Sequence, residues 1–309
     1  MQAVVIKSTG SWYIVKTEDG EELNCRIRGK FRIQGIKSTN PIVVGDQVII
    51  TQEEESFIIS ELLERRNYIV RKSVNLSKQT HIIASNVDQA ILVATIKSPT
   101  TSTSFIDRIL VAAKSYGVDV AIVFNKVDLL NKQEQLQLQD LISLYQKIGH
   151  QCFSLAILKD DLSSLKETMK GKVNVICGHS GVGKSTLLNM IQPDLDIITQ
   201  EISLQHQQGM HTTTFSEMHE LDFGAKIIDT PGIRGFGLVE INQSELCHYF
   251  PEFFALKAKC KYNNCIHVNE PNCGVKEAIE NNQVAESRYK SYLSMLESDD
   301  EHYRVNKYE

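Results

Sequence analysis

Up to about residue 66, the chain alternates short apolar runs with residues that favour turns. The runs are rich in β-branched and aromatic side chains, and pairs such as Asp19-Gly20 and Gly45-Asp46 separate them. Such a pattern predicts short β-strands joined by tight turns. The expected strands are 3–6, 12–15, 23–27, 47–50 and 57–59. About five short strands favour a small closed barrel, and we predict an OB-like β-barrel over residues 1–66.

A different pattern, in which compact apolar runs alternate with amphipathic stretches, occupies residues 67–238. The apolar runs predict strands over 89–95, 120–125, 151–154, 173–178 and 226–229. The amphipathic stretches predict helices over 104–116, 133–148, 160–169 and 184–191. Strands separated by helices indicate βαβ units, and hence a mainly parallel sheet covered on both faces. We therefore predict a central α/β domain, followed by a mainly helical C-terminal domain over residues 239–309.

The composition is that of an ordinary globular protein, with 42% hydrophobic residues and a formal net charge of −5. This overall charge gives no sign of a nucleic-acid partner, so any basic surface has to be local. No run approaches the ~20 apolar residues of a membrane span, and the N-terminus lacks the pattern of a signal peptide. Seven cysteines, three of them between residues 260 and 273, argue against a disulfide framework. We expect a reduced, cytoplasmic protein with a metal site and no membrane contact.

A local run of basic residues lies within the expected barrel. Between Leu23 and Gly45 the charged residues are all basic, and Phe31 lies among them. On a barrel of this type, such a run favours an RNA-binding face, whereas the alternative is a solvated basic loop. The candidate RNA-binding residues are Arg26, Arg28, Lys30 and Arg32.

A phosphate-binding loop follows the expected strand that ends near residue 177. Residues 178–185 fit the pattern G-x-x-x-x-G-K-S, between a strand and a helix. Backbone N–H groups of such a loop turn onto phosphate oxygens, and the helix N-terminus adds a positive dipole end. Lys184 is expected to reach the β- and γ-phosphates, and the Ser185 hydroxyl to bind Mg²⁺. The candidate nucleotide-binding residues are Gly178, His179, Ser180, Gly181, Val182, Gly183, Lys184, Ser185 and Thr186.

A second motif, N-K-x-D, indicates that the nucleotide is GTP. It comprises Asn125, Lys126, Val127 and Asp128, after an apolar strand. The Asp128 carboxylate can accept hydrogen bonds from N1–H and the N2 amino group of guanine, where adenine offers no matching donors. Ser154 follows the next strand, where a small-residue loop supports the base, although a plain loop is the alternative. Because this motif precedes the phosphate loop, the order of an ordinary small GTPase is inverted, so we predict a circularly permuted P-loop GTPase domain.

Two further segments match the parts of a GTPase that sense the γ-phosphate. Asp229 begins a D-x-x-G motif, in which the aspartate holds Mg²⁺ through water and the Gly232 N–H faces the γ-phosphate. Thr213, in a threonine run, is a candidate Mg²⁺ ligand and catalytic residue, although that run also suits the start of a strand. Ile233 follows Gly232 and cannot orient water, so intrinsic hydrolysis is expected to be slow. His211 is the candidate for that role, with Lys184 as a further catalytic residue, and a structural histidine is the alternative.

Four potential metal ligands are crowded within fourteen residues of the expected C-terminal domain. They are Cys260, Cys265, His267 and Cys273. Three thiolates and one imidazole make a closed tetrahedral site for Zn²⁺, which is structural rather than catalytic. The alternative is an incidental grouping of four residues.

Taken together, these motifs resemble those of the circularly permuted, ribosome small-subunit-dependent GTPases of the RsgA/YjeQ family. The resemblance rests on the motif order, on Gly209-x-His211-Thr212-Thr213, on the segment Asp229–Leu238 and on the Cys₃His spacing. It implies binding to the 30S ribosomal subunit and its 16S rRNA during late maturation, and GTP hydrolysis stimulated by that subunit. It also supports a catalytic role for His211, and we expect a monomer. His179 departs from the family pattern, in which a glutamine or similar residue is usual.

Two other functions are compatible with the same residues. The first is an RNA- or ribosome-binding scaffold in which the GTPase domain only senses nucleotide. The second is an ATP-dependent enzyme, which the guanine-specific chemistry expected of Asp128 disfavours.

Overall fold

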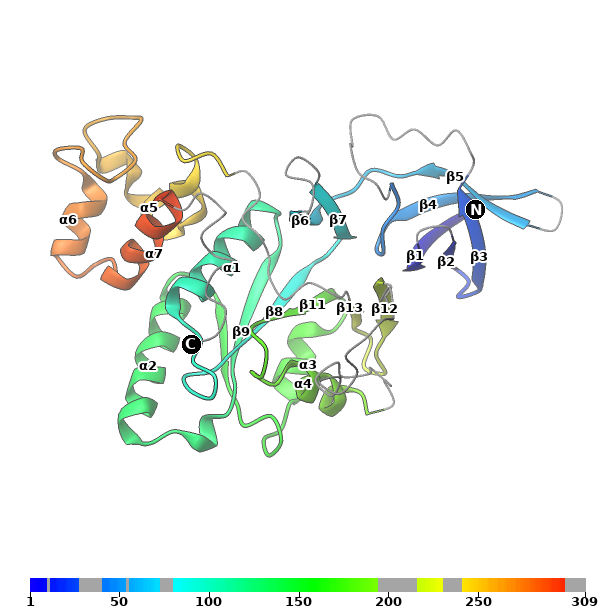
Figure 1. Cartoon of the computed structure of the whole chain (residues 1–309), viewed down its shortest axis with the longest axis horizontal. Coiled ribbons are helices and arrows are strands. Elements are labelled where there is room, and N and C mark those ends of the chain that lie inside the picture. Colours follow the sequence, from blue (N-terminus) through cyan, green and yellow to red (C-terminus); the bar gives the residue numbers. More distant parts are fainter. Residues whose placement is uncertain are drawn as a thin grey trace, which may run out of the picture.

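The computed structural model describes residues 1–9, 12–27, 41–53, 56–72, 80–193, 216–229 and 241–297. Within these ranges the chain forms a β-barrel, a central α/β domain and a C-terminal helical region. The barrel and the C-terminal helices lie on opposite sides of the central domain (Figure 1). This three-part architecture confirms the fold class predicted from the sequence. No helix in the described ranges is long and apolar enough to span a membrane.

The N-terminal strands close into a barrel because alternate side chains share an interior. The strands are β1 (Gln2–Ser8), β2 (Tyr13–Thr17), β3 (Glu22–Ile27), β4 (Gln47–Glu53) and β5 (Ser56–Leu62). They are ordered β1-β2-β3-β5-β4, and β4 also pairs with β1, which closes the barrel. In β2, Tyr13, Val15 and Thr17 are buried while Ile14 and Lys16 between them are partly exposed, as the two-residue period of a strand requires. The five strands expected from the sequence are confirmed.

A two-stranded hairpin, which the sequence analysis did not predict, joins the barrel to the central domain. It consists of β6 (Tyr68–Lys72) and β7 (Thr80–Ser85). The buried Asp46 carboxylate holds this junction, because its Oδ2 lies 2.6 Å from Nη2 of Arg65 and its Oδ1 accepts from the Ser85 hydroxyl at 2.6 Å. The Arg65–Asp46 ion pair, which is shielded from water, therefore stabilises the point at which the chain passes from the barrel to the hairpin.

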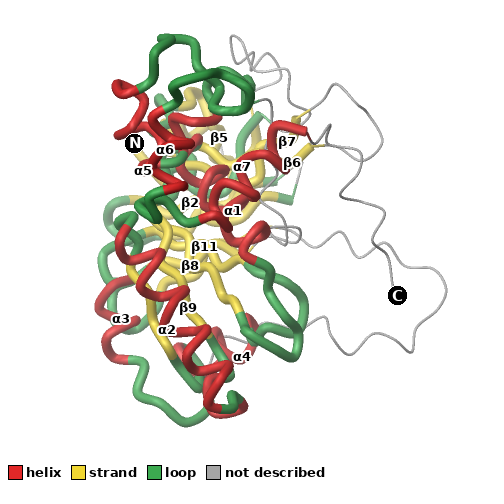
Figure 2. Tube along the Cα trace, turned by 90° about the vertical axis from the view of Figure 1, so that its left-hand side faces the viewer, coloured by secondary structure: helices red, strands yellow, loops and turns green. Residues whose placement is uncertain are grey.

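The central sheet is parallel apart from one edge strand. Its strands are β8 (Gln89–Ala94), β9 (Asp119–Phe124), β10 (Gln151–Ser154), β11 (Val173–Cys177), β12 (Ser216–Glu220) and β13 (Lys226–Asp229). The order is β10-β9-β8-β11-β13-β12, with β12 antiparallel to β13. Helices enclose the strands (Figure 2). All of β8 is buried because both of its faces are covered.

Each face of the sheet has its own pair of helices and its own core. Helices α1 (Thr103–Ser115) and α2 (Lys132–Lys147) pack on one face. Helices α3 (Ser163–Met169) and α4 (Lys184–Ile191) pack on the other. Helix α3 begins three residues later than the sequence predicts, and just before it the Asp161 carboxylate accepts from the Ser163 N–H and hydroxyl, which closes a local turn.

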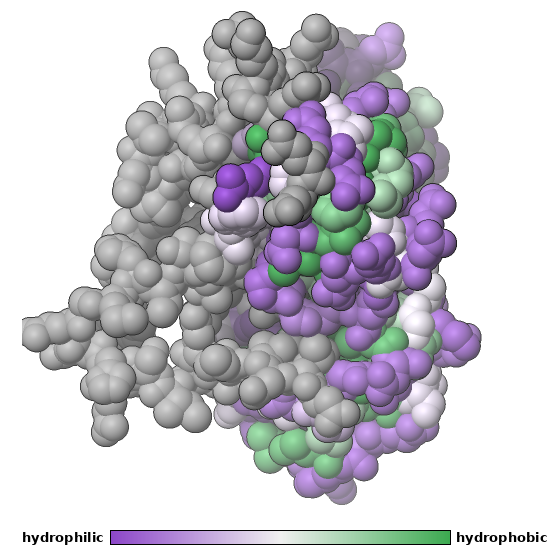
Figure 3. Space-filling model, turned by 90° about the vertical axis from the view of Figure 1, so that its right-hand side faces the viewer, coloured by the Kyte–Doolittle hydropathy of each residue, from purple (hydrophilic) through white to green (hydrophobic). Residues whose placement is uncertain are grey.

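The barrel and the central sheet share hydrogen-bonded strands. Strand β12 pairs with β1 at Lys7↔Glu217 and Ser8↔Ser216, so the described strands other than β6 and β7 form one continuous eleven-stranded sheet. Two partly exposed ion pairs support this junction, Lys7–Glu217 at 2.7 Å and Lys16–Glu220 at 2.5 Å. On the face of the molecule that carries the barrel, hydrophilic side chains predominate among the coloured residues (Figure 3).

The C-terminal region packs against helix α1. It contains η3 (Leu246–Tyr249), α5 (Pro251–Leu256), η4 (Lys257–Lys259), α6 (Gly274–Glu280) and α7 (Glu286–Glu297). Arg288 of α7 is 1% exposed and lies 2.6 Å from the Asp107 carboxylate of α1, which is fully buried. The same guanidinium bonds Glu252 at 2.7 Å, and the Tyr145 hydroxyl donates to Asp107 at 2.9 Å. A buried ionic network therefore anchors the C-terminal region to the central domain.

Candidate functional site

The phosphate loop connects β11 to α4, as the motif requires, and two of its positions admit only glycine. Gly178 has a φ of +139°, and a Cβ there lies 2.3 Å from the Val93 carbonyl oxygen. Gly183 has a φ of +105°, and a Cβ there lies 2.3 Å from Nδ2 of Asn125. An L side chain at either position meets strain and a clash. Since α4 begins at Lys184, the loop ends at a helix N-terminus, whose positive dipole end favours an anion.

The two motifs that are far apart in sequence hold each other in place. The Asn125 amide is buried, donates to the Val182 carbonyl at 2.8 Å and accepts from the Ile157 N–H at 3.2 Å. Lys126 has a φ of +61°, and its ammonium donates to the Gly181 carbonyl at 2.7 Å. These bonds tie the N-K-x-D segment to the phosphate loop, although the motifs are more than fifty residues apart in the chain. The N-K-x-D segment and the phosphate loop therefore form one site, although their order along the chain is inverted.

Both motifs line a single cavity of about 200 Å³. Its lining residues are Asn125, Lys126, Asp128, Ala156, Ile157, Leu158, Lys159, Gly181, Gly183, Lys184, Ser185 and Thr186. Ser154 ends β10 and is not one of them, whereas Ala156 and the three residues after it are. The residue predicted from the sequence therefore lies two positions before the residues that line the cavity, because strand β10 ends before the loop reaches the cavity.

The charged groups in this cavity already have partners. A hydrogen bond from Lys159, 2.6 Å away, lowers the pKa of the Asp128 carboxyl, which stays ionised and able to accept. The Lys184 ammonium donates to the His179 carbonyl of its own loop. Asp128, which the sequence predicts to read guanine, and Lys184, which it predicts to reach the phosphates, thus line the same cavity.

The unusual His179 contacts helix α1. Its imidazole stacks on Phe105, with ring centroids 3.7 Å apart and an interplanar angle of 28°. Burial, and then the nearby Lys184 charge, lower the pKa of His179, which favours the neutral ring. The departure from the usual residue therefore adds a packing contact between the phosphate loop and α1.

Several predicted site residues lie outside the described ranges. They are Arg28, Lys30, Arg32, His211, Thr213 and Gly232. Asp229 ends β13, where its backbone pairs with Glu217, but its side chain is also outside the description. Arg26 is described, and its guanidinium lies 3.8 Å from the ring centroid of Trp12.

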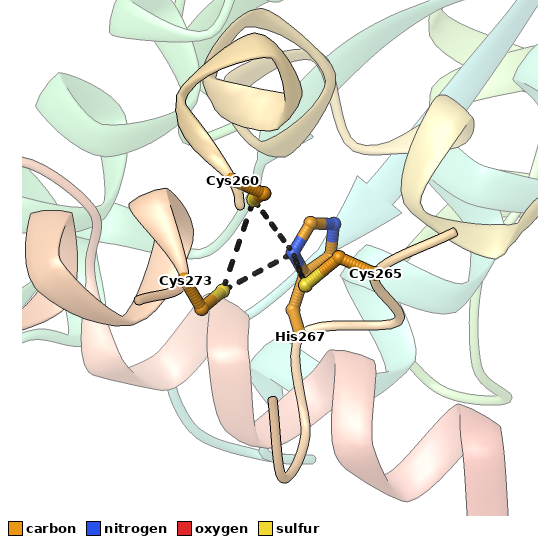
Figure 4. Close-up of side chains that lie close together, drawn as sticks. All are labelled: Cys260, Cys265, His267 and Cys273. Atoms are coloured by element: carbon orange, nitrogen blue, oxygen red, sulfur yellow. Dashed lines mark hydrogen bonds between the residues drawn. The ribbon is translucent and has the colours of Figure 1, made fainter. Parts of the chain in front are cut away.

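The four predicted metal ligands converge from separate turns of the C-terminal region. The Sγ atoms of Cys260, Cys265 and Cys273 lie 3.6, 3.4 and 3.3 Å from Nδ1 of His267 (Figure 4). The four ligand atoms all lie within 4.8 Å of one another. A tetrahedron with metal–sulfur bonds of about 2.3 Å has edges of about 3.7 Å, so the group fits a four-coordinate ion. This cluster is a candidate metal site.

Neighbouring groups fix the backbone that carries these ligands. The Tyr289 and Tyr292 hydroxyls of α7 donate to the carbonyls of His267 and Ile266, both at 2.7 Å. The Glu270 carboxylate accepts from the Ile266 N–H at 2.7 Å. Burial raises the pKa of the Cys265 thiol to about 12, so a metal ion has to displace a proton there.

Comparisons with known proteins agree with this geometry. The RsgA GTPase family profile matches residues 62–239, and the RsgA N-terminal domain profile matches residues 2–57. The chain is 52% identical to the small ribosomal subunit biogenesis GTPase RsgA of Christiangramia forsetii, over the full length of both chains. It is also 52% identical to the protein of the same description from Bacteroides fragilis, over 97% of this chain and 98% of that one.

Solved structures show the same fold. The crystal structure of YjeQ from Thermotoga maritima superposes with a TM-score of 0.78 at 36% identity, covering 96% of each chain. YloQ, described as a circularly permuted GTPase, gives a TM-score of 0.76 at 29% identity, covering 96% of this chain and 93% of that one. The chain described here belongs to the RsgA family of circularly permuted GTPases, the enzymes of small ribosomal subunit biogenesis.

Proposed function

We propose that this chain hydrolyses GTP while it assists the late maturation of the small ribosomal subunit, and that the 30S particle stimulates the reaction. The observation that carries this proposal is the shared cavity, in which the N-K-x-D carboxylate and the phosphate-loop lysine lie together. Such a cavity offers an acceptor for guanine at one end and donors for phosphates at the other. The relatives from Christiangramia forsetii and Bacteroides fragilis are described as small ribosomal subunit biogenesis GTPases.

Each part of the nucleotide has a proposed partner. Asp128 binds the guanine edge, Asn125 and Lys126 hold the base loop, and the loop from Gly178 to Thr186 surrounds the phosphates. Ser185 and Thr213 would hold Mg²⁺ directly and Asp229 would hold it through water, and the ion would neutralise charge on the phosphates. Lys184 turns from the His179 carbonyl to the phosphates, an exchange that replaces a neutral acceptor by an anionic one.

Hydrolysis needs a group that orients the attacking water. The Gly232 N–H is assigned to the γ-phosphate, and Ile233 beside it offers no polar atom. We assign the water-orienting role to His211, which precedes Thr213 by two positions. An alanine at His211 is expected to lower stimulated hydrolysis by about 10²- to 10⁴-fold while GTP affinity changes little.

The Cys₃His cluster is proposed to hold one structural Zn²⁺. All four ligand positions are supplied by the protein, so such a site leaves no position for a reacting water. Zinc bound there stabilises the C-terminal region, since the binding free energy of a structural metal is also folding free energy.

Two exposed surfaces suit a ribosomal RNA partner. On the barrel, Trp12 is 44% exposed and carries the Arg26 guanidinium on its ring. In the C-terminal region, residues 253–269 contain three lysines and no acidic residue, and Phe254 is 56% exposed. Exposed aromatic rings can stack on bases, and the cations beside them attract phosphates. These two surfaces therefore suit RNA although the chain as a whole carries a charge of −5.

The remaining assignments are part of the same proposal. Arg26, Arg28, Lys30 and Arg32 contact RNA, the protein acts in the cytoplasm, and it binds the subunit as a monomer. The boundaries near residues 66 and 238 separate the barrel, the GTPase domain and the zinc domain, although the pairing of β1 with β12 crosses the first boundary.

The decisive experiment measures phosphate release from GTP with and without purified 30S particles. Stimulation by 30S and its loss in Lys184→Ala are expected, and no stimulation at saturating particle concentration contradicts the proposal. Asp128→Asn tests the base assignment, because it is expected to weaken GDP binding by at least 10²-fold and to favour xanthosine nucleotides. An enzyme that used ATP would show neither change.

The alternative is a ribosome-binding scaffold in which the GTPase domain only senses nucleotide. The exposed Trp12–Arg26 pair lies on the barrel and away from the cavity, and this observation supports the scaffold alternative. Under this alternative, Lys184→Ala retains both ribosome association and complementation of a deletion strain.

A further inference from the structure

The cavity contains one cation that the GTPase motifs do not include. Lys159 lies in the loop after β10, and its ammonium bonds Oδ2 of Asp128 at 2.6 Å. The loop that carries Lys159 is closed by three hydrogen bonds. The Lys159 and Asp160 N–H groups donate to the Ala156 carbonyl at 2.7 and 2.9 Å, and the Ala156 N–H donates to the Asp160 carboxylate at 2.7 Å. The turn therefore presents Lys159 to the base reader in a defined position.

The ammonium of Lys159 offers Asp128 the same kind of group that guanine offers. Guanine presents two N–H donors, at N1 and N2, which match the two oxygens of one carboxylate. An ammonium also donates, and it adds a charge to the hydrogen bond. The Asp128 side chain is 28% exposed, so the carboxylate is accessible both to the Lys159 ammonium and to a base that enters the cavity. A guanine that bonds both carboxylate oxygens uses Oδ2, the atom to which Lys159 donates in this structure.

We propose that Lys159 is an intramolecular competitor of guanine, bonding the Asp128 carboxylate until the base displaces it. This inference rests on the proposed role of Asp128 as the guanine reader. The displaced ammonium swings into solvent, for which its 66% exposure leaves room. The lysine thereby limits how tightly the site holds guanine nucleotides and favours their exchange.

The sign of the effect separates competition from ordinary electrostatics. GDP and GTP are anions, so removing any nearby positive charge is expected to weaken their binding through the long-range field. Removing a competitor has the opposite effect and tightens binding. Because Lys159 is exposed, its ion pair contributes modestly, and we expect the dissociation constant for GDP to fall by about two- to five-fold in Lys159→Met.

Ionic strength and the base provide two further readouts. Salt screens an exposed ion pair, so the difference between Lys159→Met and the native chain is expected to shrink as the salt concentration rises to about 0.5 M. Inosine diphosphate lacks the N2 amino group and leaves one carboxylate oxygen for Lys159. The gain in affinity on substitution is therefore expected to be smaller for IDP than for GDP.

The test uses the full-length chain and stopped-flow measurement of ribose-labelled fluorescent GDP, with unlabelled GDP and IDP as competitors. Lys170→Met is the matched control, because Lys170 is an exposed lysine of the same domain that does not line the cavity, and it is expected to leave the affinity unchanged. A Lys159→Met chain that binds GDP as the native chain does, or more weakly, overturns the proposal. Lys159→Gln repeats the measurement with a side chain that retains a neutral donor.

The variant Asp128→Asn distinguishes a failure of the competitor proposal from a failure of the proposed function. If it abolishes the preference for guanine while Lys159→Met changes nothing, the competitor proposal fails and the proposed function stands. If Asp128→Asn binds GDP like the native chain, the base assignment fails and the competitor proposal fails with it.

Discussion

The anchor between helix α1 and the C-terminal region gives the sharpest prediction about stability. Replacing Arg288 by Met removes the guanidinium but retains a long side chain beside Phe250, over which the guanidinium lies at 4.4 Å. Asp107 then remains fully buried with the Tyr145 hydroxyl as a partner. Glu252 loses its partner too, but with 14% of its side chain exposed it can turn to water.

The expected loss follows from the burial of this pair. Breaking a buried ion pair by removing one partner costs about 3–5 kcal/mol, because the other charge remains in a poorly solvating place. The buried carboxylate also sets the pH dependence. Burial raises the pKa of Asp107 even beside Arg288, and without the guanidinium it rises further. The folded state then binds more protons than the unfolded state, so the deficit of Arg288→Met is expected to shrink from about pH 8 to about pH 5.

Hydrogen exchange of the amides of α7, followed by mass spectrometry, measures this loss locally, since a chain of several domains does not unfold in one step. A loss of 3–5 kcal/mol corresponds to exchange that is roughly 100- to 4,000-fold faster. The double variant Asp107→Asn/Arg288→Met is the control, because it removes both charges and is expected to recover at least about 2 kcal/mol. Exchange in the barrel serves as the internal reference.

Two results refute the reasoning. One is an Arg288→Met chain whose α7 amides exchange within about five-fold of the native rate, which means that the pair contributes no more than a surface pair. The other is a double variant less stable than the single one, which means that the contacts of Arg288 with its other neighbours outweigh the buried charge.

Three further predictions concern the phosphate loop, the metal cluster and the barrel. Gly183→Ala is expected to lower GDP affinity at least about tenfold, because the new Cβ displaces Asn125. The control Gly117→Ala, also at positive φ but with open space around it, is expected to cost about 1 kcal/mol of stability and no GDP affinity. Calorimetric titration and thermal unfolding compare the two variants, and equal GDP affinity contradicts the assignment. Cys265→Ser is expected to unfold the C-terminal region without changing GDP affinity. In the native chain, chelators are expected to remove the metal more readily as the pH falls, because the thiols have to lose protons to bind it. Circular dichroism and metal analysis test these two expectations, and a parallel loss of GDP binding in Cys265→Ser contradicts the first. Trp12→Ala is expected to weaken binding to 30S particles about tenfold and to leave 30S-free hydrolysis unchanged, with sedimentation of the particles as the assay and unchanged binding as the contrary result.

Local patterns predicted the parts of the fold that depend on nearby residues. The strand β8 is a compact apolar run because both of its faces are buried, and such a run is visible in the sequence. The phosphate loop was visible because its glycines serve backbone conformations and close approaches that other residues do not tolerate, as at Gly178 and Gly183. The Cys₃His cluster was visible because its ligands lie within fourteen residues.

Contacts between distant segments were not visible in these patterns. Arg288 reads as a solvated charge on an amphipathic helix, and its burial depends on Asp107, which lies 181 residues away. Lys159 reads as a loop lysine, and its relevance appears only when the turn after β10 is placed beside Asp128. Strands β6 and β7 form a two-stranded sheet that the sequence analysis did not predict. In each case, the partner is supplied by the fold rather than by neighbours along the chain.

The sharing of strand β12 between two domains has a consequence for how this protein can be cut into pieces. An isolated central domain would leave β12 as an unprotected sheet edge, and unprotected edges invite pairing between molecules. The residues of β12 that face the barrel lysines, Glu217 and Glu220, are acidic. Charged side chains on an edge strand discourage such pairing. The same two carboxylates thus bond the barrel lysines in the whole chain, and in an isolated central domain they are expected to disfavour pairing between molecules at this edge.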